Sequence, residues 1–326
     1  MEIAREVSES SWMDFVYECP GFNLFQSPAF YHVLERTRGY RPHVLTSSKD
    51  GTIQAVLVSV LVSYLHIKFN RFVTSALILG GPLGEPAFFP ALLEAHDSIA
   101  SRGAVLSQIR NVHPPESRET ITNSGYVWTD QLDYVIDLRK DEEDLLRAMS
   151  KSRRKNLSIA DESDLHAVQL SARDKDEIYA VLRQTYSRAG IPLADRSLFD
   201  SALDALPRSG DLWAVGARHV NDLCALRLVL RWKDWLFDWY AGSTDVGRRL
   251  HADEWLLWRI LRDGIKEGCH TFIFGGAGEP DKPYGPREFK RRFGGEMVNP
   301  GRFEKVYHPV MLRGAEFGYR VWRKLH

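Results

Sequence analysis

One order of elements occurs twice along this chain, and it constrains the fold more than any other feature. In each half a predicted strand, a loop, a helix, a glycine and a second strand follow one another. These segments are 76–79, 88–102, Gly103 and 105–109, and then 235–241, a helix that we expect Asp253 to cap, Gly268 and 271–274. A strand, a helix and a parallel strand form a right-handed crossover. We therefore predict two copies of one α/β unit.

The flanking segments complete each copy with antiparallel strands and helices. The sequence predicts helices at 28–38, with Ser27 as cap, and at 178–189, and strands at 43–45, 52–64, 212–217 and 223–231. A strongly charged helix is expected from Asp141, in "RKDEEDLLRAMSKSRRKN". We accordingly place a first domain at 1–140, a second at 141–309, and a C-terminal helix at 310–326 that packs on the first.

Composition excludes several classes of protein. The 326 residues carry 43 basic and 43 acidic side chains, so a general nucleic-acid coat or a polybasic membrane anchor is not expected. No stretch reaches the ~18 apolar residues that span a bilayer. The three cysteines are far apart, and neither they nor the histidines show metal-ligand spacing. We expect a cytoplasmic protein with no metal site.

Several motifs in this order resemble the FemAB-like family of the GNAT superfamily. They are "NLFQSPAFYHVLE" from Asn23, "GGPLG" from Gly80, "MSKSRRKNLSIA" from Met149, "WYAGSTDVGRRLHADEWLLWRILRDGIKEGCHTFIFGG" from Trp239 and "FKRRFGG" from Phe289. The resemblance covers most of the chain. It implies an α/β fold of two tandem GNAT-like domains packed around a shared cleft, the fold of acyl-coenzyme A N-acyltransferases.

The resemblance also implies a transferase. Many members of this family join an amino acid carried on tRNA to a cell-wall precursor, and others transfer acyl groups in exopolysaccharide production. We expect transfer of an activated acyl or aminoacyl group to an amine of an envelope precursor such as a peptidoglycan peptide. The alternatives are an acyl-coenzyme A-dependent N-acyltransferase of exopolysaccharide synthesis and a non-catalytic binding protein. The donor is aminoacyl-tRNA or acyl-coenzyme A, and no tightly bound cofactor is expected.

"PREFKRRFGG" has two interpretations. Pro286 suits the first helical position, Phe289 and Phe293 lie one turn apart, and Gly294 suits the position after the helix, so a well-made helix end explains the basic residues. The resemblance, however, places a functional lysine at Lys290, where a cation would orient the donor or stabilise charge at an attacked carbonyl.

Four arginines and two tyrosines are candidates for binding substrate or donor. "GSTDVGRRLHAD" lacks the glycines that let backbone amides cradle the pyrophosphate of coenzyme A, although Arg248 and Arg249 could hold a phosphate through their side chains. In "YSRAGIPLADRSLFD", Arg196 matches a family arginine that contacts precursor phosphates, and Tyr186 and Arg188 accompany it. Tyr240 is the remaining candidate. Solvated surface roles are the alternative for the arginines.

"LFDWYAGS" supplies a candidate general base. Because side chains alternate along a strand, we expect Asp238 and Tyr240 on the same face, with Asp238 able to take a proton from an attacking amine. A structural, hydrogen-bonded aspartate is the alternative. The cations of "SKSRRKN" could contact RNA, but a solvated face paired with the acidic residues at 141–144 is the simpler interpretation.

Overall fold

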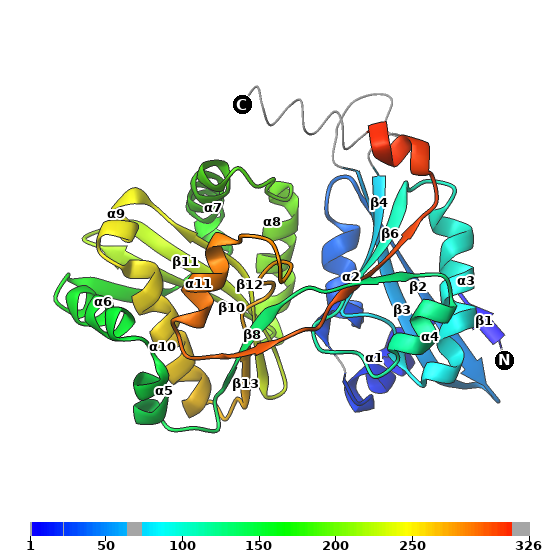
Figure 1. Cartoon of the computed structure of the whole chain (residues 1–326), viewed down its shortest axis with the longest axis horizontal. Coiled ribbons are helices and arrows are strands. Elements are labelled where there is room, and N and C mark those ends of the chain that lie inside the picture. Colours follow the sequence, from blue (N-terminus) through cyan, green and yellow to red (C-terminus); the bar gives the residue numbers. More distant parts are fainter. Residues whose placement is uncertain (1, 22, 64–73, 315–326) are drawn as a thin grey trace. The chain divides into compact units, whose positions relative to one another are not determined.

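The computed structural model describes residues 2–21, 23–63 and 74–314, which form two compact units (Figure 1). The first unit comprises Met1–Asp130 and Pro300–His326, and the second comprises Gln131–Asn299. Both limits fall earlier in the chain than the predicted limits at 140 and 309. Strand pairing explains the difference, because residues 133–137 pair within the second sheet and residues 302–306 pair within the first.

The first unit is a mixed sheet with helices. Its elements are β1 (Glu2–Ala4), α1 (Glu9–Glu18), η1 (Leu24–Gln26), α2 (Pro28–Glu35), β2 (Tyr40–Lys49), β3 (Thr52–Ser63), β4 (Thr74–Leu79), β5 (Leu83–Gly84), η3 (Pro86–Phe88), α3 (Phe89–Ala100), β6 (Leu106–Arg110), α4 (Arg118–Asn123), β7 (Val127–Thr129) and β15 (Arg302–Val306). The strand order is β1-β2-β3-β4-β6-β15-β7, with β5 beside β3. The predicted cap of α2 is confirmed, since Ser27 Oγ accepts from the Phe30 N–H.

The second unit repeats this plan. Its elements are β8 (Asp133–Asp137), α5 (Glu142–Ala148), α6 (Lys151–Asp161), β9 (Leu165–Gln169), η4 (Ala172–Asp174), α7 (Lys175–Ala189), α8 (Arg196–Ala205), η5 (Leu206–Arg208), β10 (Leu212–His219), β11 (Asp222–Trp232), β12 (Trp235–Ser243), α9 (Asp245–Arg249), α10 (Ala252–Lys266), β13 (Thr271–Ile273), α11 (Gly285–Arg291) and β14 (Glu296–Val298). The strand order is β14-β8-β13-β12-β11-β10-β9.

The repeated crossover predicted from the sequence is confirmed. In the first unit β4 leads through α3 to the parallel strand β6, and in the second β12 leads through α9 and α10 to the parallel strand β13. The α/β fold of two GNAT-like units is therefore present. Residues 309–314 are helical, and the rest of the predicted C-terminal helix, like the predicted end of the strand at Tyr64, lies outside the described residues.

The two copies differ where their central strands separate. β4 and β6 pair from Ser75 to Leu79, whereas β12 and β13 pair only from Trp235 to Phe237. In the first unit Gln26 also fills a gap between strands: its amide donates to Leu79 O (2.7 Å) and Val58 O, and its oxygen accepts from Val58 N. Within the described residues, only the second sheet therefore leaves the end of a central strand open on one edge.

The charged segment after Asp141 forms two helices, not the single helix predicted. Ser150 stands between α5 and α6, and its side chain accepts from the Arg153 N–H, which starts a new helix. Arg153 is buried and paired with Glu254, so this cation does not belong to a solvated face. Arg154 donates to carbonyls at the end of α5, including Leu146 O (3.1 Å).

The predicted cap of α10 was wrong. The residue before the helix is His251, which has φ +55° and no side-chain capping bond, and Asp253 already lies inside the helix. The Asp253 carboxylate instead reaches Arg227 on β11. The Asp253 carboxylate, which the sequence predicted to cap the helix, therefore forms a charged contact inside the unit.

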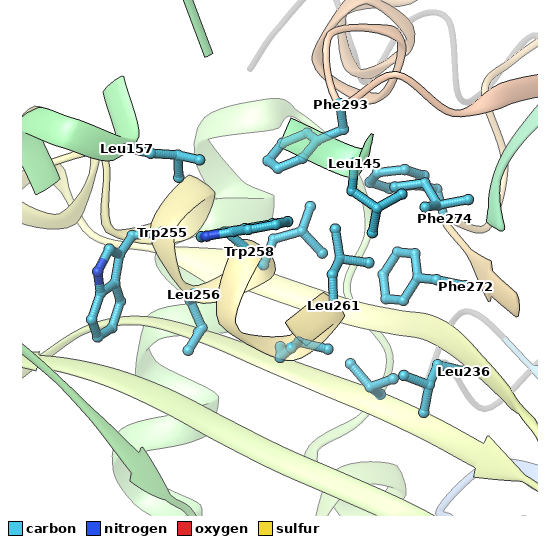
Figure 2. Packing of buried hydrophobic residues seen from close by; sticks show 14 of the residues in the cluster. Leu145, Leu157, Leu236, Trp255, Leu256, Trp258, Leu261, Phe272, Phe274 and Phe293 are labelled. Carbon is cyan, nitrogen blue, oxygen red and sulfur yellow. The ribbon is translucent and has the colours of Figure 1, made fainter. Parts of the chain in front are cut away.

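The core of the second unit lies between α10 and the sheet. Figure 2 shows Trp258, Leu261 and Phe272 meeting there, with Leu145 from α5 and Phe293 from the segment after α11 closing one side. Phe289 and Phe293 lie one turn apart as predicted, with ring centroids 5.3 Å apart. Gly294 has φ +83° but lies three residues after the last helical residue, Arg291, and not directly after the helix as predicted.

A chain of polar groups crosses the first unit beneath α3. His43 Nε2 lies 2.6 Å from Ser59 Oγ, and Ser59 Oγ lies 3.1 Å from His96 Nδ1. His96 Nε2 lies 2.9 Å from Ser107 Oγ. Burial lowers the pKa of His43 to about 4, with a contribution from Arg5, and lowers that of His96 to about 3. Both rings are therefore neutral in the folded unit near pH 7.

Acidification is expected to destabilise this unit. A histidine in the unfolded chain has a pKa of ~6.5, so stability is fully present above that pH and falls as the pH decreases toward about 3, because the unfolded chain takes the proton first. For His96 we expect a loss of ~2 kcal/mol between pH 7 and pH 5. Urea unfolding at both pH values measures this loss. His96→Asn should flatten the pH dependence, and His166→Asn, at an exposed position, should not; equal slopes in all three proteins would contradict the assignment.

Candidate active site

The open edge of β12 is where the second unit can take a ligand. Beyond Phe237, β12 pairs with β11 alone among the described residues, and Phe237 to Ala241 are only partly buried. A register shift occurs there, because Leu228 faces Tyr240 and Val229 faces Asp238, which leaves Trp239 as an extra residue. A bulge of this kind re-aims side chains and ends regular pairing.

The bulge overturns the predicted alternation of Asp238 and Tyr240. Directly paired residues share a face of a sheet, and Leu228 and Val229 are consecutive, so Asp238 and Tyr240 lie on opposite faces. Asp238 lies on the face of the sheet that α10 covers. The Tyr240 ring lies on the other face and contacts Phe199 of α8, with ring centroids 4.7 Å apart. α7 and α8 (green) and α10 (yellow to orange) lie on different sides of this sheet (Figure 1).

A buried arginine fixes Asp238. Arg227 of β11 is only 2% exposed; its Nη1 donates to Asp238 Oδ2 and its Nη2 donates to Asp253 Oδ1 at 2.8 Å. Burial alone would lower the pKa of Arg227, but the charges of Asp238 and Asp253 raise it above its usual value. The guanidinium therefore stays charged between two carboxylates and sets the orientation of Asp238.

The second oxygen of Asp238 has no hydrogen-bond partner among the described residues. The side chain is 8% exposed, and this oxygen, Oδ1, is buried. An unpaired buried carboxylate oxygen is costly, and functional sites are where such costs are usually retained. This oxygen can accept a hydrogen bond from an amine and then its proton.

Lys290 lies deeper than its predicted role at the donor requires. It is 8% exposed, and its Nζ donates to three carbonyls: Phe274 (3.0 Å), Gly275 (2.8 Å) and Gly276 (2.6 Å). Burial lowers the pKa of Lys290, an effect that the charges of Asp133 and Asp238 oppose. Asp133 is also buried, and burial raises its pKa although Lys290 and nearby backbone amides act against this.

Aromatic rings line the other face of the opening. The Tyr186 and Tyr240 ring centroids are 5.7 Å apart, and the Trp239 ring meets Tyr240 at 5.0 Å. Burial raises the pKa of Tyr186, and the charges of Asp238 and Tyr284 raise it further. Tyr186 and Tyr240, two of the predicted site residues, therefore lie together on the face of the sheet opposite to Asp238.

The turn where a conventional acetyltransferase holds the pyrophosphate is a short helix, α9, in this chain. Thr244 Oγ accepts from Gly247 N, Arg248 N donates to Thr244 O, and Leu250 N donates to Val246 O. A Cβ at Gly247 would lie 2.2 Å from Cys224 O, so this glycine serves close packing. Several amides that could have cradled a phosphate are consequently used inside α9.

The predicted arginines are spread over the surface around this helix. Arg248 and Arg249 are exposed, and Arg248 pairs with Asp245 at 2.9 Å. Arg188 donates to Ser243 O (3.1 Å) and to Asp245. Arg196 is 44% exposed at the start of α8, where it pairs with Asp176 (2.6 Å) and Asp200 (3.1 Å). Exposed pairs of this kind are weak, and they leave a guanidinium free to exchange partners.

Sequence reasoning missed Arg227, Asp133 and the pair of Arg153 with Glu254. The Arg153 guanidinium stacks over the rings of Phe289 and Phe293, with centroid distances of 4.5 and 4.4 Å. A signal for Arg227 was present, because it interrupts the apolar strand "LCALRLVL" at a position that must be buried. No group of three or more His, Cys, Asp or Glu side chains among the described residues could hold a metal ion.

The fold and the similarities to known proteins indicate an acyltransferase of the GNAT fold. Residues 144–291 match the family model described as "Acetyltransferase (GNAT) domain". The expected FemAB-like resemblance is confirmed in the fold: the crystal structure of FemX matches with a TM-score of 0.73 at 14% identity, covering 96% of this chain and 99% of that one. No curated protein sequence matches this chain.

Two further structures are similar. The L-PGS structure from Bacillus licheniformis has a TM-score of 0.58 at 15% identity and covers 96% of this chain and 97% of that chain. A tandem GNAT protein from the clavulanic acid biosynthesis pathway has a TM-score of 0.59 at 11% identity and covers 94% of this chain and 99% of its own. Identities this low establish a shared fold. None of the helices in the described part of the chain has the length and apolar character to cross a membrane.

Proposed function

We propose that the second unit transfers an aminoacyl or acyl group to an amine of a cell-envelope precursor, such as a peptidoglycan peptide, with Asp238 as general base. The observation that carries the proposal is the free Oδ1 of a buried carboxylate whose other oxygen is held by Arg227. A positioned carboxylate of this kind can take the proton that an attacking amine loses as the amide bond forms.

The charges around Asp238 favour an amine as the acceptor. Three described carboxylates, Asp133, Asp238 and Asp253, lie among two described cations, Arg227 and Lys290. Burial raises the pKa of Asp133 and of Asp253. Asp238 Oδ1 accepts no hydrogen bond from the described residues. An ammonium group would supply a positive charge and a hydrogen bond to this oxygen.

The backbone of α9 favours a donor other than coenzyme A. Several of its amides are bonded within the helix, so fewer are free to hold a pyrophosphate than in a glycine-rich turn. An aminoacyl group carried on tRNA does not need that cradle.

The second candidate is an acyl-coenzyme A-dependent N-acyltransferase of exopolysaccharide synthesis. The match of residues 144–291 to an acetyltransferase domain favours it, as do the exposed Arg248 and Arg249 beside α9. Here the two arginine side chains would hold the pyrophosphate in place of backbone amides.

Calorimetric titration with UDP-N-acetylmuramoyl-pentapeptide tests the acceptor. We expect binding near the micromolar range, about −8 kcal/mol, and a weakening of ~10-fold in Arg196→Ala because a phosphate contact by arginine is lost. Arg183→Ala, at an exposed position of α7, should bind like the parent protein. No heat at millimolar ligand would reject this acceptor. Binding of acetyl-coenzyme A in a parallel titration, weakened by Arg248→Ala, would favour the second candidate.

A further inference from the structure

The loop between β13 and α11 has an unusual source of hydrogen bonds. It runs from Phe274 to Tyr284 through "GGAGEPDKPY" and contains no helix or strand. Gly275 and Gly276 have φ +68° and +73°, a consecutive left-handed pair that other residues adopt only with strain. Backbone carbonyls in such a loop need partners from outside it, since no regular ladder supplies them.

Lys290 supplies the partners for the first turn. Its ammonium has three N–H donors, and each is directed to one of three consecutive carbonyls, those of Phe274, Gly275 and Gly276, at 2.6–3.0 Å. The group is therefore fully coordinated by main-chain oxygens of its own unit. No donor of Lys290 is left over for a phosphate or a carbonyl of a substrate.

Arg287 supplies the partners for the rest of the loop. It lies on α11 three residues before Lys290, and its guanidinium donates to the carbonyls of Ala277 (2.8 Å), Glu279, Pro280 (3.0 Å) and Lys282 (3.2 Å). Two cations of one short helix thus bind seven carbonyls of the preceding loop. These bonds add to the packing of Phe274 and Ala277 in the core and to the bridge between Gly278 and Leu132 in fixing the path of the loop.

The loop they hold touches the strand of the candidate base. A Cβ built on Gly275 would lie 3.2 Å from Asp238 O and 3.1 Å from the ring of Phe237. The backbone of Gly275 therefore lies directly against β12 at the residue where β12 and β13 separate. At its other end the loop leads to Tyr284, whose side chain lies against Gly278.

We propose that the Phe274–Lys282 loop is a main-chain cation site whose resident cations, Lys290 and Arg287, are positioning residues that hold the loop against Asp238. Lys290 then acts on the reaction through the position of β12 and does not contact the acyl donor. The link to Asp238 rests on the proposed function, whereas the cation site itself does not. In the native protein the cations in this site are side chains of the same chain. The chemical class that could replace the Lys290 ammonium is a small monovalent cation with N–H donors.

Removing Lys290 should open this site to a cation from solution. In Lys290→Ala, without substrate, we expect the thermal unfolding midpoint to fall by ~5 °C or more, because three carbonyls that are buried or partly buried lose their partner. Ammonium or methylammonium chloride at 50–100 mM should restore at least half of that loss. Tetramethylammonium chloride, which has no N–H and is larger, should restore none of it.

Matched variants make the result specific. Arg291→Ala, on the same helix but exposed and paired with Glu288, should keep the parent midpoint in every salt. Arg287→Ala should lower the midpoint, and methylammonium should not restore it. A single ammonium group cannot reproduce the planar set of N–H donors of the lost guanidinium. If Lys290→Ala does not fold, Lys290→Gln takes its place, because its amide can donate two of the three hydrogen bonds.

Two outcomes would overturn the proposal. One is a Lys290 variant with the parent midpoint, and the other is a lowered midpoint that ammonium and tetramethylammonium change equally. Once an acyl transfer is measurable, Lys290→Ala should lower kcat with the donor KM unchanged, and ammonium should restore kcat. A raised donor KM would instead indicate direct contact with the donor. Because the midpoint is measured without substrate, failure of the proposed reaction leaves this test intact.

Discussion

Replacing Arg227 with methionine is expected to lower the free energy of unfolding of the second unit by ~3–5 kcal/mol, the usual cost of removing one partner from a buried ion pair. Methionine fills much of the same volume, so the loss comes from charge. Asp238 and Asp253 would be left facing each other without the guanidinium that both accept from. Urea unfolding followed by tryptophan fluorescence measures the change.

A second arginine of the same strand is the control. Arg231 is on β11, but its partner Glu267 lies 3.3 Å away and is well exposed. Arg231→Met should therefore cost no more than ~1 kcal/mol. Equal losses in the two variants would mean that Arg227 contributes through packing alone. Adding Asp238→Asn to Arg227→Met should recover part of the loss, because one buried charge is removed as well.

Replacing Asp238 with asparagine is expected to reduce acyl transfer by ~10²–10⁴-fold while the protein stays folded, because general-base catalysis contributes about that factor. The amide keeps the shape of the side chain, and Arg227 retains Asp253 as its charged partner. Rates with the donor and acceptor identified by titration measure the loss.

Two neighbouring aspartates test whether this effect belongs to Asp238. Asp245 is exposed on α9 and pairs with Arg248, so Asp245→Asn should transfer at the parent rate. Asp253→Asn removes a partner of Arg227 without touching Asp238 Oδ1, so it should reduce stability more than rate. Asp238→Asn with the parent rate would exclude Asp238 as the base and return it to a structural role.

The fold was largely predictable because its signals are local. Gly103 and Gly268 mark the ends of two helices, and the residues around each give the same order of strand, helix and strand. Apolar alternation and turn residues report on a few neighbouring positions, so strands such as β10 to β12 could be placed to within a few residues. The cap of α2 at Ser27 is local in the same way.

The site was predictable only in its residue types. Asp238, Tyr240 and Lys290 were singled out, but the sequence did not indicate that a bulge at Trp239 turns Asp238 and Tyr240 to opposite faces. Nor did it indicate that Lys290 turns inward to the carbonyls of its own loop. Arg227 was missed because a lone arginine in an apolar strand has no local partner; its partners are 11 and 26 positions away.

The sequence by itself determined a doubled α/β plan, the helix cap at Ser27 and the kinds of side chain available for acyl transfer. Periodicity, capping and turn chemistry act over a few residues, and so they can be read along the chain. Only the tertiary structure decided which charges are buried together, which carboxylate oxygen is left free and which end of a central strand stays open. Those properties depend on contacts between residues distant in sequence, where burial sets the cost of each unpaired charge.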